Sequence, residues 1–379
     1  MWQSLHDAWW RLATQSHPHS FGDILASSAL KVGATAYGAS VSLRNTAYDR
    51  GWAKQVRLPC RVVSVGNLTV GGTGKTACVA LIAKKLLAQG RRVAILSRGY
   101  GGSSDPYWLR WEDDRLVVTG AGRAASRRLA DEPQWLARRL PGVPIVVGAK
   151  RERSGRLACA TLGAEIAILD DGFQHRRVQR DCDIVLVHAR MPFSGWAVLP
   201  RGPMREPLAA LARAHVIIAT KADEAFGTLG ALAERLRSFN ADAAFVTASH
   251  EPTELVDGAT GERQDLARLA GMRVGLLSSI GDPSGFEATV NRLQASAVWH
   301  RAFPDHHPYR EEDWAKIVEW AAASRPDAIV TTEKDWVRLA PHLAPRTSGS
   351  VPVWVLGVQM KILSGEELLD GRLAGVCAR

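Results

Sequence analysis

The chain has 379 residues, of which 46% are hydrophobic and 23% are charged. This length predicts about two domains, and the composition excludes a wholly disordered protein because it supplies enough apolar side chains for a core. The net charge is +10, and 38 of the 48 basic residues are arginines. Such an excess predicts an anionic partner, which is a nucleic acid, an acidic lipid surface or a phosphorylated small molecule.

The five cysteines form no CxxC pair and have no zinc-ligand spacing with histidine, which predicts free thiols in a reducing compartment. The first 20 residues lack the continuous apolar stretch of a secretory signal. No run of 18 apolar residues occurs, so no transmembrane helix is expected.

Residues 1–60 differ from the rest of the chain. A weakly apolar stretch of small residues, 24–43, is interrupted by Lys31 and followed by basic residues. Aromatic side chains flank it, namely Trp2, Trp9, Trp10, Phe21, Tyr48 and Trp52. This pattern predicts a helix that lies in the membrane interface. A helix packed on the domain behind it is the alternative.

From residue 61 onward, short apolar strands alternate with helices. The expected strands are 61–66, 92–97, 144–148, 165–171, 183–189, 215–220 and 243–249, with hairpins at 108–118 and 253–265. A second α/β set follows, with strands 273–279, 327–332 and 352–357 and helices near 284–295 and 311–324. The pattern predicts an α/β fold with a mostly parallel sheet covered on both faces. We expect a helical segment at 1–60, a P-loop core domain at 61–265 and a smaller α/β domain at 266–379.

Residues 64–76, SVGNLTVGGTGKT, join a strand to a helix through a glycine-rich loop. Backbone N–H groups of such a loop and the positive end of the helix bind phosphates. We expect a nucleotide to contact Thr69, Val70, Gly71, Gly72, Thr73, Gly74, Lys75 and Thr76. Lys75 reaches the β- and γ-phosphates, and the Thr76 hydroxyl is a ligand of Mg²⁺. Thr69 departs from the pattern, which has glycine at that position.

Residues 165–175, EIAILDDGFQH, place two aspartates at the end of a buried strand. A carboxylate in this position commonly holds Mg²⁺. If the strand stays extended, Asp170 and Asp171 project to opposite sides. One of them is therefore free to face the metal while the other turns toward a different group.

These motifs, together with ILSRGYGG (95–102), DEP (131–133), LDDGFQHRR (169–177), LPRGPMREPL (199–208), FPDHHPY (303–309) and TTEKD (331–335), resemble the tetraacyldisaccharide 4'-kinase family. The matches occur in order over about residues 60–335. The resemblance implies that ATP, with Mg²⁺, phosphorylates the 4'-hydroxyl of an anionic tetra-acylated glucosamine disaccharide 1-phosphate to form lipid IVA. It also implies a location on the cytoplasmic face of the inner membrane, peripheral or monotopic.

The resemblance further assigns roles to residues. Asp131 is the candidate catalytic base, paired with His306; Asp170 matches the metal ligand, and Asp171 and Lys75 match catalytic groups. Arg205, Glu206, Gln174 and His175 match positions near the lipid substrate. Because Asp131 and His306 are far apart in sequence, we expect the pair to meet across two domains when ATP binding closes one over the other.

Two other functions are weaker alternatives. The segment TKAD (220–223) is similar to the guanine-reading pattern of a GTPase-type switch or metal-insertion chaperone, but Thr220 replaces its asparagine. A nucleic-acid-binding ATPase would fit the high pI, yet no nucleic-acid module is recognisable. The positive charge is concentrated in 1–60, 91–156 and 172–213. This distribution favours an acidic leaflet, ATP and a phosphorylated lipid; we expect no nucleic acid and infer no obligate protein partner.

Overall fold

The computed structural model describes residues 21–99, 105–120, 129–190, 197–225, 227–342 and 351–378. The chain has an α/β fold and forms two compact units. The first unit contains Met1–Leu129, Leu136–Ser249 and Lys361–Arg379, and the second contains Ala130–Trp135 and His250–Met360.

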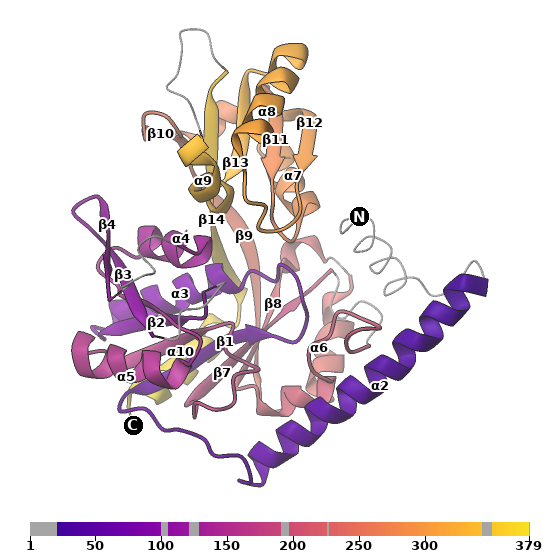
Figure 1. Cartoon of the computed structure of the whole chain (residues 1–379), viewed down its shortest axis with the longest axis vertical. Coiled ribbons are helices and arrows are strands. Elements are labelled where there is room, and N and C mark those ends of the chain that lie inside the picture. The colour runs from indigo at the N-terminus through magenta and orange to yellow at the C-terminus, as the bar shows by residue number, and fades with distance from the viewer. Residues whose placement is uncertain are drawn as a thin grey trace. The chain divides into compact units, whose positions relative to one another are not determined.

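The first unit is built on a mostly parallel sheet with the order β9-β8-β7-β1-β6-β2-β5-β3-β4 (Figure 1). β1 lies between β6 and β7 and is parallel to both, whereas β3 and β4 form an antiparallel hairpin at the edge. The strands are β1 (Arg61–Asn67), β2 (Val93–Ser97), β3 (Tyr107–Glu112), β4 (Arg115–Thr119), β5 (Ile145–Val147), β6 (Ile166–Asp170), β7 (Cys182–His188), β8 (Val216–Thr220) and β9 (Ala244–Asp257). The helices are α2 (Phe21–Asp49), α3 (Lys75–Ala88), α5 (Arg151–Leu162), α6 (Leu229–Arg237) and α10 (Glu366–Cys377), together with the second half of α4 (Asp131–Arg139), whose residues up to Trp135 belong to the second unit.

The second unit has a smaller sheet of order β12-β11-β13-β14-β9, in which β11 is parallel to β12 and β13. Its further elements are β10 (Arg263–Gln264), β11 (Arg273–Ser278), α7 (Pro283–Arg292), β12 (Ser296–Ala302), α8 (Glu311–Ser324), β13 (Ala328–Thr332), α9 (Glu333–Leu339) and β14 (Val353–Ser364). Two apolar clusters form its core, around Leu276 and Ile317.

The division into units differs from the expected domains 1–60, 61–265 and 266–379. The chain enters the second unit within β9 and leaves it within β14, so both boundaries fall inside strands and not in loops. The C-terminal helix α10 belongs to the first unit, where Lys85 of α3 forms ion pairs with Glu366 and Asp370 at 2.6 and 2.9 Å. Helix α2 also groups with the first unit instead of standing apart.

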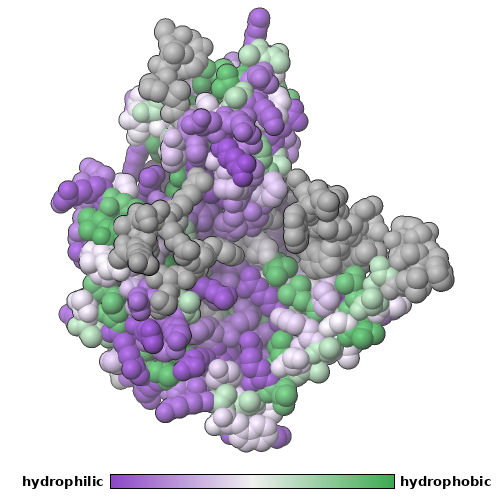
Figure 2. All heavy atoms as spheres, in the orientation of Figure 1, coloured by the Kyte–Doolittle hydropathy of each residue, from purple (hydrophilic) through white to green (hydrophobic). Residues whose placement is uncertain are grey.

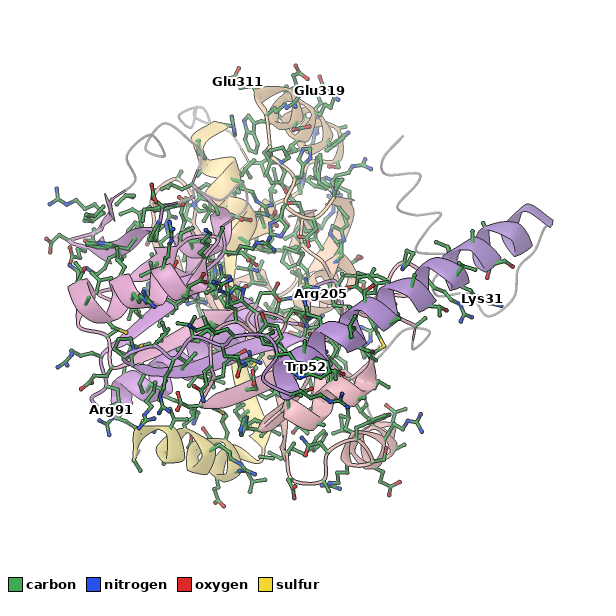
Figure 3. The ribbon with its side chains drawn as sticks, turned by 60° about the horizontal axis from the view of Figure 1, so that its bottom comes forward. Lys31, Trp52, Arg91, Arg205, Glu311 and Glu319 are labelled. Carbon is green, nitrogen blue, oxygen red and sulfur yellow. The ribbon has the colours of Figure 1, made fainter. Side chains whose placement is uncertain are left out.

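Helix α2 has one face toward the core and one toward solvent. Ala34, Val41 and Asn45 are buried, whereas Val32 and Leu43 are 72% and 66% exposed. Pale and green spheres run along this helix in Figure 2, and Lys31 points away from the body in Figure 3. Within the described ranges, no helix is long and apolar enough to cross a bilayer. The predicted interfacial residues Trp2, Trp9 and Trp10 lie outside the described residues.

Candidate active site

The loop between β1 and α3 has the backbone that a phosphate loop needs. Gly71 and Gly74 have φ values of 105° and 81°, which side-chain-bearing residues rarely adopt. Gly74 directly precedes α3, whose first N–H groups have no acceptor within the helix and lie at its positive end. The loop therefore fits an anion such as a phosphate.

Asn67, at the end of β1, organises this loop. It is fully buried, and its Nδ2 donates to the Thr73 hydroxyl at 2.9 Å. Its Oδ1 accepts from Lys75 Nζ at 3.4 Å, and its carbonyl accepts from Gln174 Nε2 at 2.9 Å. The sequence assigned no role to Asn67, although it stands inside the glycine-rich motif.

The first part of the loop is paired with the segment that carries Arg205. Val70 N donates to Pro203 O at 2.8 Å, Arg205 N donates to Leu68 O at 2.6 Å, and Thr69 forms an antiparallel bridge with Met204. Because the N–H of Val70 is used in this pairing, it does not donate to a phosphate here, and a contact of Val70 with the nucleotide stays a prediction. Thr69 has the same structural task, which explains why the motif tolerates a residue other than glycine there.

The two aspartates at the end of β6 have different partners. Asp170 is buried and lies 3.3 Å from the hydroxyl of Ser97, measured from Oδ2. Asp171 has φ 52°, so the backbone does not stay extended at this residue, and the condition for the two side chains to project to opposite sides is not met. Its carboxylate accepts from Arg205 Nη1 at 2.8 and 3.0 Å, and Oδ1 lies 3.7 Å from Lys75 Nζ.

These cations determine the charge state of Asp171. Burial opposes ionisation, but the charges of Lys75 and Arg205 outweigh it and lower the pKa of Asp171. Behind the strand end, buried Arg151 donates to the carbonyls of Gly148 and Asp170 at 2.8 and 3.2 Å. Burial lowers the pKa of Arg151 to about 10, so it remains a cation at neutral pH.

Thr76 and Asp170 were predicted to hold Mg²⁺, and their oxygen atoms are of the hard type that this ion prefers. Thr76 is in the first turn of α3, and Asp170 is paired with Val65 of β1. Among the described residues, no group of three or more His, Cys, Asp or Glu could hold a metal ion. This donor set fits Mg²⁺ bound jointly with substrate phosphates, which is its usual mode.

Gln174 and His175, predicted to lie near the lipid substrate, directly follow this acidic turn. Burial lowers the pKa of His175 to about 4, and the charge of Arg151 acts in the same direction, so the imidazole is neutral at pH 7. Within the part of the chain that the structure describes, Gln174 Oε1 and His175 Nε2 are buried without a hydrogen-bond partner. Both atoms are therefore suited to a polar ligand.

Glu206 does not fit its predicted contact with the substrate. Its side chain is fully buried and accepts from Asn45 at 2.8 Å, Arg213 at 2.9 Å and Arg44 at 3.4 Å. A carboxylate enclosed in this way cannot touch a substrate directly. It instead fastens α2 to the segment that carries Arg205, which is labelled in Figure 3.

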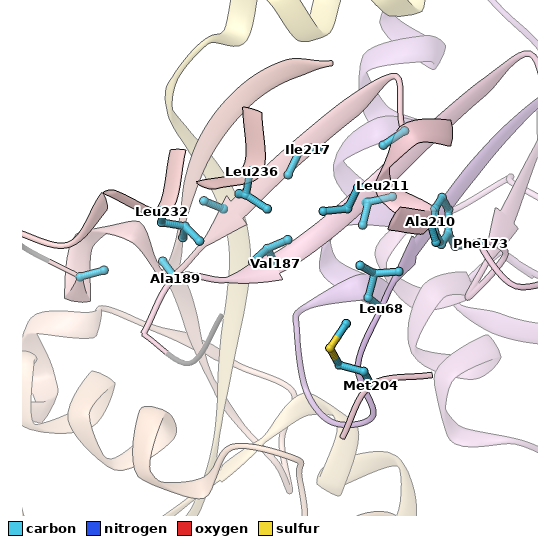
Figure 4. Close-up of a cluster of buried hydrophobic side chains, with 14 residues drawn as sticks. Leu68, Phe173, Val187, Ala189, Met204, Ala210, Leu211, Ile217, Leu232 and Leu236 are labelled. Atoms are coloured by element: carbon cyan, nitrogen blue, oxygen red, sulfur yellow. The ribbon is translucent and has the colours of Figure 1, made fainter. Parts of the chain in front are cut away.

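One hydrophobic cluster joins three of the motifs. Leu68 of the phosphate loop, Phe173 of the acidic turn and Met204 of the PMREP segment are buried together against β7 and β8 (Figure 4). Gly66 makes the close approach possible, because a Cβ there would lie 2.7 Å from the Cβ of Phe173. Packing therefore holds these segments in register with one another.

The predicted pair Asp131–His306 lies in the second unit. Asp131 begins α4, and its Oδ2 is 3.0 Å from His306 Nδ1. Because residues 130–135 group with the second unit, the expectation that the pair bridges two domains is wrong. His306 has φ 60°, an uncommon backbone conformation that is often found at functional sites.

The charges of the pair support each other. Burial alone would raise the pKa of Asp131, but the hydrogen bond and charge of His306, followed by Arg338 and Lys334, lower it to about 2. The hydrogen bond to Asp131 raises the pKa of His306 above its usual value, against the effect of burial. Asp131 is therefore a carboxylate at neutral pH, available to accept a proton.

Known proteins resemble this chain over nearly its full length. A family model described as tetraacyldisaccharide-1-P 4'-kinase matches residues 26–377. A tetraacyldisaccharide 4'-kinase from Anaeromyxobacter dehalogenans is 41% identical over 374 residues, covering 98% of this chain and 94% of the relative. The corresponding protein from Syntrophus aciditrophicus is 40% identical and covers 88% of each chain.

Among solved structures, LpxK from Aquifex aeolicus in complex with ATP matches with a TM-score of 0.69 and 29% identity. The match covers 93% of this chain and 99% of that one. The phosphate loop, the acidic strand end and these similarities lead to the same conclusion: the chain is a kinase that belongs to the tetraacyldisaccharide-1-P 4'-kinase family.

Proposed function

We propose that this protein transfers the γ-phosphate of ATP to the 4'-hydroxyl of a tetra-acylated glucosamine disaccharide 1-phosphate, which gives lipid IVA. The observation that carries the proposal is the phosphate loop, whose Lys75 lies beside the paired Asp171 and Arg205 in a chain of this kinase family. The relative from Aquifex aeolicus is described as a complex with ATP, which supports ATP as the donor.

The phosphate loop binds the triphosphate of ATP. N–H groups of Gly72, Gly74 and the first turn of α3 bind phosphate oxygens, and Lys75 contacts the β- and γ-phosphates. Thr76 and Asp170 would hold Mg²⁺, which would neutralise charge on the transferred phosphoryl group. Asp171 keeps Lys75 and Arg205 in place until the phosphate charge competes for them.

Asp131 and His306 act on the acceptor. The hydroxyl oxygen forms a bond to the γ-phosphorus as the bond from that phosphorus to the β–γ bridging oxygen breaks, and the hydroxyl proton passes to the Asp131 carboxylate. His306 orients this carboxylate through the 3.0 Å hydrogen bond. Closure of one domain over the other on ATP binding stays a prediction.

The lipid substrate is recognised near the acidic turn. Arg205 carries the positive charge for an anionic headgroup, and Gln174 and His175 offer polar atoms for its sugar. We infer that the protein works on the cytoplasmic face of the inner membrane, with the exposed apolar residues of α2 in the interface. The net positive charge of residues 1–60, with six basic and three acidic side chains, suits an acidic leaflet.

The test incubates purified protein with ATP, Mg²⁺ and the tetra-acylated disaccharide 1-phosphate, and follows the acceptor by mass spectrometry. We expect the acceptor to gain one phosphate with wild-type protein and with Lys84→Ala, an exposed lysine on the same helix as Lys75. The Lys75→Ala variant should lose activity by about 100-fold or more, because a charge that stabilises the transition state is removed. An unmodified acceptor with wild-type protein, or a preference for GTP, would contradict the proposal.

A further inference from the structure

A buried carboxylate lies behind the Asp131–His306 pair. Asp335, in α9, is fully buried and accepts from Ser279 N at 3.0 Å, Thr332 Oγ1 at 2.7 Å and Tyr309 OH at 3.2 Å. The Ser279 hydroxyl also donates to it. Since every one of these partners belongs to the second unit, the cluster is a fixed part of that unit.

Arg338 connects this carboxylate to the pair. Its side chain is only 8% exposed, and its Nη2 donates to Asp335 Oδ1 at 2.9 Å and to Ser279 O at 3.2 Å. Its Nη1 lies 3.5 Å from Asp131 Oδ2, the same oxygen that contacts His306. The carbonyl of Ser279 also accepts from His306 N at 3.2 Å. Arg338 therefore contacts Asp131, Ser279 contacts His306, and Arg338 and Ser279 are hydrogen-bonded to each other.

We propose that Arg338 is a positioning residue for the catalytic pair: held by Asp335, it fixes the carboxylate of Asp131 against His306. Arg338 and His306 both contact Oδ2 of Asp131. The other oxygen, Oδ1, is therefore the one that faces the proton of the acceptor hydroxyl. This inference rests on the proposed role of Asp131 as base. A planar guanidinium suits the task because its donors keep fixed directions toward two carboxylates.

Other charges also act on the pair. Lys334 Nζ lies 2.9 Å from Glu132 Oε1, and Asp305 Oδ1 lies 3.8 Å from His306 Nε2. Arg338 is a cation in direct reach of Asp131, so its removal takes away a charge that stabilises the carboxylate. We expect the pKa of Asp131 to rise when Arg338 is replaced by a neutral residue.

The experiment compares Arg338→Met, Arg338→Lys and a control, Arg268→Met. Arg268 is an exposed arginine of the same unit that stacks on Trp354. The first measurement is the pKa of the Asp131 carboxyl by NMR of ¹³C-labelled aspartate, assigned with Asp131→Asn. The second is kcat with ATP and the lipid disaccharide, measured for each variant alone and in the Asp131→Asn background.

We expect Arg338→Met to raise the pKa of Asp131 and to lower kcat by about tenfold or more, a loss within the range of acid–base catalysis. Arg338→Lys retains the charge and should keep the pKa low, and Arg268→Met should match wild type. In the Asp131→Asn background, Arg338→Met should cause little additional loss of kcat, because the two residues act through one group.

An unchanged pKa of Asp131 in Arg338→Met would overturn the inference. So would a loss of kcat that is equally large with and without the Asp131 carboxylate, because that result describes a purely structural residue. A raised pKa together with no lipid phosphorylation by wild-type protein would overturn the proposed function alone and leave the coupling of Arg338 to Asp131 intact.

Discussion

The hydroxyl of Tyr37, in the middle of α2, donates to the carbonyl oxygen of Arg205 at 3.0 Å. The guanidinium of Arg205 binds Asp171 at 2.8 Å. The N-terminal helix therefore contacts the residue that neutralises the acidic strand end beside the phosphate loop. Any change that loosens α2 is expected to reach this site through Arg205.

Replacing Tyr37 with Phe tests this contact. The change removes one hydrogen bond and leaves the ring, so we expect the free energy of unfolding to fall by about 0.5–1.5 kcal/mol, measured by urea denaturation. Ser40→Ala is the control, because the hydroxyl of this exposed residue donates within α2 itself, to Ala36 O at 2.9 Å. Equal stability of Tyr37→Phe and wild type would show that the contact contributes nothing.

Removing the buried carboxylate of Glu206 should lower the free energy of unfolding much more than removing the Tyr37 hydroxyl. In Glu206→Ala, the partners Arg213 and Asn45 lose their acceptor while Arg213 stays largely buried. Breaking a buried ion pair typically costs about 3–5 kcal/mol, and we expect a loss of this size in the free energy of unfolding. Arg92–Glu165, a solvent-exposed pair, provides the comparison: Glu165→Ala should lower the free energy of unfolding much less than Glu206→Ala.

The packing of the acidic turn against Gly66 can be tested by replacing this glycine with alanine, with Gly371 as the control position. A Cβ on Gly66 would lie 2.8 Å from the backbone nitrogen of Phe173, so Gly66→Ala must displace that turn. We expect a loss of about 1–3 kcal/mol in stability, together with reduced kcat. Gly371, in α10, has nothing within 4 Å of a Cβ, and Gly371→Ala should stabilise the protein by up to about 1 kcal/mol. The reverse order of the two melting temperatures would refute this packing.

The Asp131–His306 pair predicts a pH-dependent stability. The lowered pKa of Asp131 stabilises the fold above about pH 3.9, and this contribution is lost as the pH falls toward about 2. The raised pKa of His306 stabilises it below about pH 6.5, and this contribution is lost as the pH rises through the folded value. The melting temperature of His306→Ala should therefore differ most from wild type near about pH 5 and much less near about pH 9. A constant difference would count against the ion pair.

The exposed apolar residues of α2 and the adjoining turn predict binding to vesicles. Val32 and Leu43 on α2 and Trp52 after it are 72%, 66% and 66% exposed. Replacing all three with Ser should reduce sedimentation with vesicles that contain acidic phospholipid, because each buried Å² of apolar area contributes about 25 cal/mol. Leu368→Ser, a change of an exposed leucine on α10, should leave binding intact. If the triple variant and Leu368→Ser bound vesicles equally well, α2 would not be the segment that contacts the membrane.

Local motifs made the nucleotide site predictable from the sequence. The glycines, Lys75 and Thr76 are contiguous, and a strand–loop–helix sequence restricts where their backbone groups point. Asp170 and Asp171 were found for the same reason, at the end of an apolar strand. The roles of Asn67, Ser97 and Arg151 were not predicted, although Asn67 and Ser97 stand inside the motifs SVGNLTVGGTGKT and ILSRGYGG. A sequence motif does not show which of its side chains form hydrogen bonds with other segments of the chain.

The sequence by itself determined the α/β class, the order of most elements, the phosphate loop and the kinase family, because these depend on local periodicity and contiguous motifs. Only the tertiary structure decided the pairing partners. Glu206 binds Asn45 across 161 residues, and Asp131 meets His306 across 175, in the same compact unit and not between two. Such contacts depend on how strands and loops pack in three dimensions, and one long strand, β9, runs continuously from the first unit into the second.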